Sequence, residues 1–226
     1  YRISYPDEKL FTFYLDEFET KLFDLPEGVY TCLIENEDCE EQILTPGMDD
    51  EIFSRTKVPM TKNEVRVLSI SRLELTKNAV VYDVGSGTGS VSAECARLST
   101  DIVVFAIEQK EEAANLTKEN AARLGLSDQI VVINKKAPEG FEELPTPTHV
   151  FVGGSSGALS DILSAVQKKL IVKENTKEKT DKTSKRVRVV INAVSLETIA
   201  QITKLIQTYP VAHVQLTQIQ ASRAHK

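Results

Sequence analysis

Residues 80–90 are Val80-Val81-Tyr82-Asp83-Val84-Gly85-Ser86-Gly87-Thr88-Gly89-Ser90. An apolar, largely β-branched run ends here in an acidic residue and three glycines at alternate positions, and an amphipathic segment, residues 91–98, follows at once. This order predicts a buried strand, a tight glycine-rich turn and the start of a helix. Such a turn brings bare backbone and a helix N-terminus against a ligand.

A second apolar run, residues 102–107, ends in Glu108, which lies 25 residues after Asp83. An acidic residue at the tip of the second strand is where a nucleoside ribose is held through its hydroxyls. The alternative is an acid at the end of a strand that only solvent contacts. The spacing favours the ribose.

From Thr61 onward, strand and helix patterns alternate. We expect strands at 79–84, 102–107, 129–133, 149–152, 187–191 and 211–219. We expect helices at 61–75, 90–98, 111–124, 158–170 and 196–209, and a short helix after Pro138. Thr61 is the expected N-cap of the first helix, because Glu64 follows at the capping-box spacing. Repeated strand–helix–strand units with near-continuous apolar strands predict an α/β fold with a doubly wound, mainly parallel sheet.

Ligands of such sheets bind beyond the carboxyl ends of the strands. The chemically suggestive residues all follow an expected strand: the turn at 85–89, Glu108, the turn at 135–138, Gly153-Gly154 and Asn192. We therefore expect them to meet at one edge of the sheet.

Residues 1–45 do not continue this pattern. Residues 10–13 and 29–34 could be strands that flank a short helix at 15–23, and such a segment is too small to bury a core of its own. We expect residues 1–45 to be the remnant of a preceding domain with an acidic linker, and residues 46–226 to form the main domain. Residues 173–185 have the composition of a disordered surface loop.

Composition limits the classes of function. Residues 1–50 carry 14 acidic and 3 basic side chains, whereas residues 51–226 carry 19 acidic and 24 basic ones. The larger part therefore suits an anionic small molecule, but it lacks the basic stripe with interleaved aromatics of a nucleic-acid binder. No apolar run approaches the roughly 20 residues that span a bilayer. The three cysteines form no CxxC pair, which favours the cytoplasm, and the three histidines share no metal-ligand spacing, so we expect no metal.

The spacing of the glycines discriminates between nucleoside cofactors. Gly85-x-Gly87-x-Gly89 departs from the GxGxxG of dinucleotide folds, and a GxxxxGK[ST] phosphate loop is absent. Asp83 would repel a pyrophosphate. A carboxylate suits S-adenosylmethionine, which carries a sulfonium, an ammonium and a ribose without phosphate. The sequence therefore predicts this cofactor, with the glycines against its methionine part and Glu108 on its ribose.

Five motifs occur in order along about residues 46–226. They are Arg55-Thr56-Lys57-Val58-Pro59-Met60-Thr61-Lys62, DVGSGTGS at 83–90, Ala137-Pro138, Phe151-Val152-Gly153-Gly154, and Asn192-Ala193-Val194 with Glu197. Together they resemble the decarboxylating precorrin-6 or cobalt-precorrin-6 methyltransferases of cobalamin biosynthesis. The resemblance implies a class I, Rossmann-like methyltransferase. It also implies methylation of precorrin-6B or cobalt-precorrin-6B at carbon 15, with decarboxylation of the ring C acetate.

The resemblance adds site residues to those predicted above. The combined cofactor contacts are Thr61, Asp83, Gly85, Ser86, Gly87, Thr88, Gly89, Glu108 and the backbone of Ala137. Candidate substrate contacts are Arg55, Met60, Gly153, Gly154 and Arg223. Asn192 and Glu197 are catalytic candidates by position, although a turn former and a helix N-terminal acid are equally good interpretations. Relatives commonly have Gly-Asp where this chain has Lys135-Lys136, so an acid that could hold the adenine amine is missing.

The first 35 residues resemble the closing strand–helix–strand of the tetrapyrrole methylase fold, through Tyr5-Pro6-Asp7-Glu8 and residues 30–35. This implies a bifunctional C5,15-methyltransferase whose preceding domain methylates carbon 5, and a further strand after the last residue. It also implies a homo-oligomer, up to a tetramer. Two alternatives stay open: a methyltransferase that acts on RNA, protein or another small molecule, and a non-catalytic cofactor-binding fragment.

Overall fold

The computed structural model describes residues 11–21, 45–175 and 186–222, and the chain divides into two units, Tyr1–Gln42 and Ile43–Lys226. In the first unit, a 3-10 helix, η1 (Leu15–Glu17), continues into α1 (Phe18–Lys21). The short helix expected at 15–23 is therefore present. Residues 11–13 are irregular and not a strand, because the chain turns directly into η1, where the Glu17 N–H donates to the Tyr14 carbonyl. The strand expected at 29–34 lies outside the described residues.

The second unit is built on a five-stranded sheet with the strand order β3-β2-β1-β4-β5. Its strands are β1 (Val80–Val84), β2 (Val103–Ile107), β3 (Ile130–Ile133), β4 (His149–Val152) and β5 (Arg188–Ile191). Every neighbouring pair is parallel, which confirms the predicted fold, and each strand begins within one residue of its expected start. The central strand is β1, because the chain first builds outward through β2 and β3 and then crosses to β4 on the other side. The order therefore reverses at the carboxyl end of β1, where sheets of this kind bind ligands.

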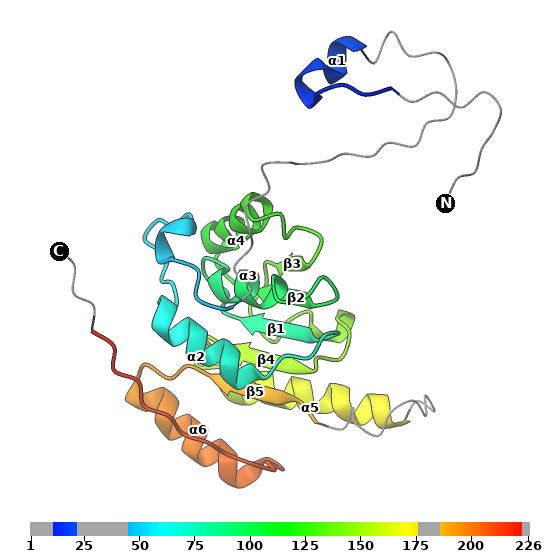
Figure 1. Ribbon diagram of the computed structural model, residues 1–226. Helices are drawn as coiled ribbons and strands as arrows, with labels where there is room; N and C mark the ends of the chain where they lie inside the picture. Colours follow the sequence, from blue (N-terminus) through cyan, green and yellow to red (C-terminus); the bar gives the residue numbers. More distant parts are fainter. Residues whose placement is uncertain (1–10, 22–44, 176–185, 223–226) are drawn as a thin grey trace. The chain divides into compact units, whose positions relative to one another are not determined.

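Helices cover both faces of the sheet (Figure 1). They are α2 (Asn63–Leu73), α3 (Ser90–Ala96), α4 (Glu111–Arg123), α5 (Leu159–Asn175) and α6 (Leu196–Thr208), with 3-10 turns η3 (Asp50–Ile52) and η4 (Phe141–Glu143). Alternate residues of β1 serve opposite faces: Val81 packs in the core beneath α2 and α3, and Tyr82 packs in the core beneath α5. This alternation along a strand that is apolar except for Asp83 is why β1 is buried on both sides.

The first helix of this unit differs from its prediction. α2 begins at Asn63 with Lys62 as N-cap, so Thr61 is not the cap. The physical reason is that the Asn63 N–H already has an acceptor, the carboxylate of Asp50, at 3.1 Å. The buried face of α2 contains Arg66, Ser69, Ile70 and Leu73.

Two further expectations were wrong. α5 continues to Asn175, so residues 173–175 are helical; residues 176–185, the rest of the expected loop, lie outside the described part. Residues 211–219 are not a strand, because within the described chain no ladder hydrogen bond joins them to the sheet. A strand needs such a partner whatever its sequence alternation, and Leu216 is 87% exposed.

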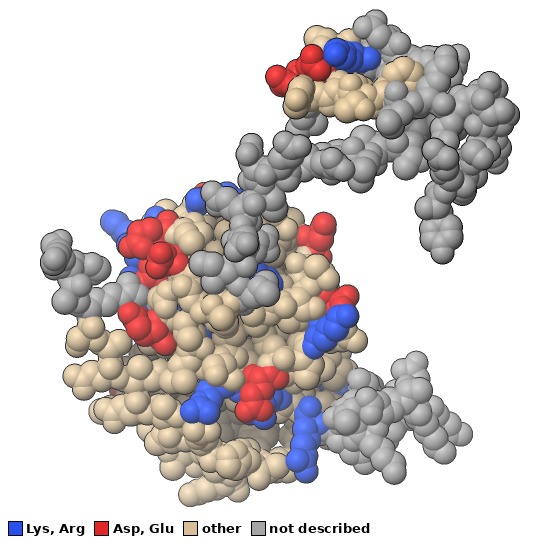
Figure 2. All heavy atoms as spheres, viewed as in Figure 1, with Lys and Arg blue, Asp and Glu red and all other residues tan. Residues whose placement is uncertain are grey.

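The surface of the second unit carries both signs of charge. On the face shown in Figure 2, Lys and Arg side chains are mixed with Asp and Glu among uncharged residues. No helix within the described residues combines the length and the apolarity needed to cross a membrane.

Candidate active site

The residues that directly follow the strands meet at the carboxyl edge of the sheet, as expected. Hydrogen bonds continue the ladder one residue past each strand: Gly85 N–H donates to Ile107 O at 2.8 Å, and Glu108 N–H to Ile133 O at 3.0 Å. On the other side, Gly153 N–H donates to Val84 O at 2.9 Å. In the same way Asn192 N–H donates to Val152 O at 3.0 Å. The ends of all five strands are therefore locked side by side.

The glycine-rich turn, residues 85–89, is in close contact with two neighbouring segments. Gly85 has a φ of +74°, and a Cβ placed there would lie 2.6 Å from the carbonyl oxygen of Gly154. A Cβ at Gly87, with a φ of +59°, would lie 2.9 Å from the carbonyl oxygen of Pro59. Only glycine satisfies both the backbone angle and the space. The turn is therefore in direct backbone contact with the loop after β4 and with the 55–62 segment.

Glu108 is fixed within this turn. Its Oε2 accepts from the Gly87 N–H at 3.1 Å and its Oε1 from the Lys110 N–H at 2.9 Å. The side chain is 8% exposed, which excludes the interpretation as a solvated acid at a strand end. A carboxylate has about four lone-pair positions, so Glu108 keeps acceptor capacity for hydroxyl groups.

Asp83 is a buried acid with an unsatisfied oxygen. It is 1% exposed, its Oδ2 accepts from the Ser92 hydroxyl at 2.5 Å, and its Oδ1 has no hydrogen-bond partner among the described residues. Burial raises the pKa of Asp83 to about 6, although hydrogen bonds from Ser92 oppose the shift. The hydroxyl of Thr88 is buried and without a partner in the same way. Buried groups of this kind call for a bound molecule or water that completes them.

A buried ion network, which we call the Arg66 network, holds the wall of the site. It consists of Asp50, Arg66 and Glu94, each at most 2% exposed. Arg66 donates to Asp50 at 3.1 Å, to Glu94 at 3.2 Å and to the carbonyl of Thr61 at 2.7 Å. Glu94 also accepts from the backbone N–H groups of Gly47 and Met48, and the Arg66 guanidinium lies 4.9 Å from the Phe53 ring centroid. The segment before α2 is thereby tied to α2 and α3.

Sequence reasoning missed this network. The signal was present, because Arg66 shares its helix face with Ile70 and Leu73 at the i+4 and i+7 positions, and Glu94 is the one acid of α3. A charged residue at such a position indicates a buried partner of opposite charge.

The 55–62 segment lies against the site with its charged residues outward. Thr56 donates to Glu112 at the start of α4 at 2.6 Å, and the Ser54 N–H donates to Asn120 at 2.7 Å. The side chain of Arg55 is exposed, whereas Met60 is half-buried and packs on the core. The start of this segment is thus fixed to α4, and its middle contacts the glycine-rich turn through Pro59.

Ala137 lies in the loop after β3, at the same edge. Its side chain is half-buried against the core beneath α5. Asn134, in the same loop, donates from Nδ2 to the carbonyl of Glu108 at 2.8 Å, which ties this loop to the end of β2. The loop that contains Ala137 is therefore tied to the end of β2.

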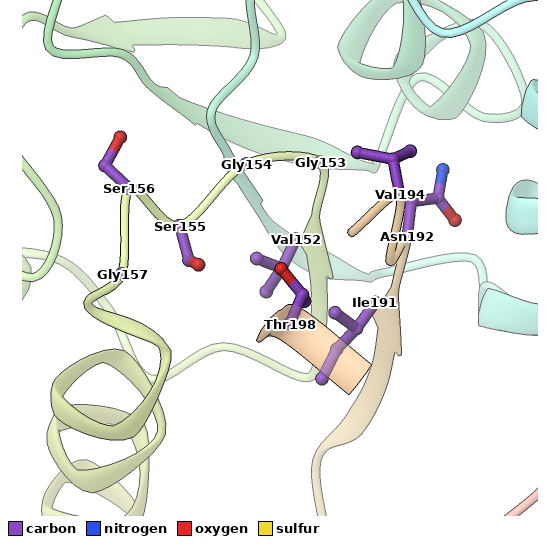
Figure 3. Close-up of a pocket in the computed structure, with 10 residues that line it drawn as sticks. All are labelled: Val152, Gly153, Gly154, Ser155, Ser156, Gly157, Ile191, Asn192, Val194 and Thr198. Carbon is purple, nitrogen blue, oxygen red and sulfur yellow. The ribbon is translucent and has the colours of Figure 1, made fainter. Parts of the chain in front are cut away.

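A cavity of about 250 Å³ opens between the ends of β4 and β5 (Figure 3). We call it the β4–β5 cavity; it is lined by Val152, residues 153–157, Ile191, Asn192, Val194 and Thr198. The Oδ1 of Asn192 accepts from the Ser69 hydroxyl at 3.1 Å, which fixes the amide at the cavity wall. Because Gly154 also contacts Gly85, the cavity and the glycine-rich turn share a backbone wall.

The other two candidates do not join this cavity. Glu197 is exposed in the first turn of α6 and is not among the cavity residues. Hydrogen bonds from its own backbone N–H and from Ser195 hold the pKa of Glu197 below its usual range, so it is a poor proton donor. Arg223 lies outside the described residues.

A family profile described as a precorrin methyltransferase domain matches residues 51–226. The chain belongs to the precorrin methyltransferase family. It is therefore a member of a family of methyltransferases, and its parallel sheet is the Rossmann-like sheet of class I methyltransferases.

Named relatives agree with this family. A probable cobalt-precorrin-6B C(15)-methyltransferase (decarboxylating) of Pyrobaculum calidifontis is 44% identical over 128 residues, which are 56% of this chain and 66% of that relative. A Saccharolobus solfataricus protein of the same name is 30% identical over 190 residues, 83% of this chain and 89% of that protein. The crystal structure of precorrin-6y C5,15-methyltransferase from Geobacter metallireducens matches with a TM-score of 0.62 and 30% identity, over 73% of this chain and 78% of the other.

Proposed function

We propose that this precorrin methyltransferase domain binds S-adenosylmethionine at the glycine-rich turn. We propose further that it methylates carbon 15 of precorrin-6B or cobalt-precorrin-6B and removes the carboxyl group of the ring C acetate. The observation that carries the proposal is the backbone contact between Gly85 and Gly154, which sets the glycine-rich turn directly beside a cavity of about 250 Å³. The names of the relatives supply the reaction, and this arrangement is suited to it.

The residues of the turn fit the cofactor. Gly85 and Gly87 leave room for backbone contact with its methionine part, and Glu108 has free lone pairs for the two ribose hydroxyls. The unsatisfied Oδ1 of Asp83 is an acceptor for the cofactor's ammonium, through a direct or a water-mediated hydrogen bond. Thr61 and the backbone of Ala137 complete the proposed contacts.

The residues of the chain contribute by positioning the cofactor and the macrocycle. When bound, S-adenosylmethionine supplies a methyl group on a sulfonium, which an electron-rich carbon of the macrocycle displaces in line. No side chain needs to act as a nucleophile, so the work of the protein is to hold two partners in attack geometry and to exclude water. Asn192, fixed by Ser69, is placed to hydrogen-bond the macrocycle at the cavity wall.

The proposed contact to Asp83 predicts a pH dependence of cofactor binding. The pKa of Asp83 is raised to about 6 by burial, with a smaller contribution from repulsion by Glu108. A cationic ammonium favours the carboxylate form, so affinity should rise as pH increases through about 6 and then level off. Calorimetric titration with S-adenosylmethionine between about pH 5 and 7, where the cofactor's amine stays protonated, measures this.

Two variants make that test specific. Asp83→Asn should bind more weakly above pH 6 and lose the dependence, because it cannot ionise. Ser92→Ala should move the midpoint to higher pH, because it removes a hydrogen bond that lowers the pKa. An affinity of the unaltered protein that stays constant across this range would contradict the contact.

A turnover assay distinguishes three candidate functions: a decarboxylating precorrin methyltransferase, a methyltransferase with another substrate, and a non-catalytic module. Incubation with S-adenosylmethionine and precorrin-6B, or its cobalt form, should give a product heavier by one methyl and lighter by one carboxyl, as read by mass spectrometry. Methylation without loss of carbon dioxide would contradict the decarboxylating half. Binding of the cofactor with no turnover would indicate a non-catalytic module, and methylation of RNA or protein alone would indicate another methyltransferase.

We also propose that the chain belongs to a bifunctional C5,15-methyltransferase that self-associates and acts in the cytoplasm on a tetrapyrrole. Support comes from the resemblance of residues 1–35 to a tetrapyrrole methylase and from the name of the Geobacter structure. Methylation at carbon 5 by the full-length protein tests the first part, and light scattering tests self-association.

A further inference from the structure

Charge is distributed unevenly along the carboxyl edge of the sheet. The loops after β2 and β3 carry Lys110, Lys135 and Lys136 together with Glu108 and Glu139. The loops after β4 and β5, residues 153–157 and 192–195, contain no charged residue. The β4–β5 cavity follows this division, because all of the residues that line it are uncharged.

The walls of the cavity are largely apolar or backbone. Val152 is 2% exposed, and Ile191 and Val194 form further apolar surface (Figure 3). The polar groups are the amide of Asn192 and three hydroxyls, those of Ser155, Ser156 and Thr198. A space of about 250 Å³ has room for several water-sized groups, and so for a two-carbon carboxymethyl arm.

We propose that the β4–β5 cavity holds the acetate carboxylate that leaves as carbon dioxide. This rests on the proposed function, and it assigns the decarboxylation to a defined part of the site. The cationic side chains lie on the other part of the edge, where they can pair with carboxylates that the substrate retains.

An uncharged cavity promotes this step because the negative charge moves during it. In the ground state the charge is localised on the carboxylate, which a pocket without a cationic side chain stabilises less than one that contains such a cation. As the bond between the carboxyl carbon and the methylene carbon breaks, its electron pair enters the conjugated macrocycle and carbon dioxide leaves. A proton from water then adds to the methylene carbon and completes the methyl group. A cation in the cavity would oppose the step, because it would stabilise the ground state.

The position of the cavity agrees with this assignment. Gly154 lines the cavity and contacts Gly85 of the glycine-rich turn, so a macrocycle placed over this wall can present one carbon to the cofactor and one arm to the cavity. The same macrocycle needs no large movement between the two steps.

The test introduces a charge with a matched neutral control. Thr198 is half-buried on α6 and lines the cavity. Thr198→Lys should bind the substrate more tightly, in absorbance titrations without cofactor. It should also release carbon dioxide about tenfold more slowly, since a charge-assisted hydrogen bond would stabilise the carboxylate before it leaves. Thr198→Met, of similar length, should show neither the tighter binding nor the slower release. Tighter binding combined with slower decarboxylation is the result that a purely structural defect would not produce.

A second pair of variants keeps the test valid if the Thr198 variants fail to fold. Val194 is 97% exposed at the cavity wall, so Val194→Lys and Val194→Met should both fold and should differ in the same direction. If lysine and methionine variants at both positions bind the substrate equally and release carbon dioxide at the same rate, the assignment is overturned and the cavity holds a neutral part of the macrocycle. That outcome differs from a failure of the proposed function, in which the unaltered protein gives no methylated product.

Discussion

Arg66→Met should lower the free energy of unfolding by about 3–5 kcal/mol, the largest effect expected for a single change in this chain. Arg66 is fully buried, and its removal leaves the buried carboxylates of Asp50 and Glu94 with only the less buried cations of Lys62 and Arg97. Burying an unpaired charge costs far more than losing an exposed pair. Urea denaturation followed by circular dichroism measures the change.

The matched control is Arg72→Met on the same helix. Arg72 is exposed, so this variant should change the unfolding free energy by less than about 0.5 kcal/mol. Arg66→Met should also weaken cofactor binding, because Arg66 donates to the carbonyl of Thr61. Equal stabilities of the two variants would show that the Arg66 network does not hold the domain together.

Gly85→Ala should destabilise the fold by more than about 2 kcal/mol and abolish cofactor binding. The new Cβ would lie 2.6 Å from Gly154 O, at a φ of +74°. Neither backbone can retreat easily, because hydrogen bonds lock Gly85 N–H to Ile107 and Gly153 N–H to Val84. Thermal unfolding and calorimetric titration report the two effects separately.

Gly125→Ala measures the loss of stability that comes from the positive φ alone, without a steric clash. Gly125 has a similar φ of +67°, but a Cβ there would have nothing within 4 Å. This variant should lose only about 1 kcal/mol and keep cofactor affinity. If the two variants proved equally stable, the close approach between the turn and the loop after β4 would be refuted.

The sheet and the position of the site were predictable because both depend on local pattern. Near-continuous apolar runs such as 80–84 and 149–152 identify buried parallel strands, and the residue that follows each strand must lie at the carboxyl edge. Glu108 and Gly85 were located in this way before any contact was known.

What sequence reasoning missed depends on partners that are distant in the chain. Asp50 and Glu94 lie 16 and 28 residues from Arg66, so no local pattern joins them. The N-cap of α2 was misplaced for the same reason, because Asp50 accepts the hydrogen bond that a capping box would have supplied. The alternating segment 211–219 failed as a strand because alternation describes a face and does not provide a neighbouring strand.

The contacts made by the segment before α2 set the minimum length of this domain. A protein trimmed to begin at Asn63 would keep all five strands and every helix from α2 onward. It would lose Asp50 from beside Arg66, the Gly47 and Met48 N–H donors to Glu94, and the Pro59 carbonyl that flanks Gly87. The shortest segment that keeps these contacts therefore begins before the first helix and strand of the sheet unit. A fusion partner or tag should be attached before Gly47.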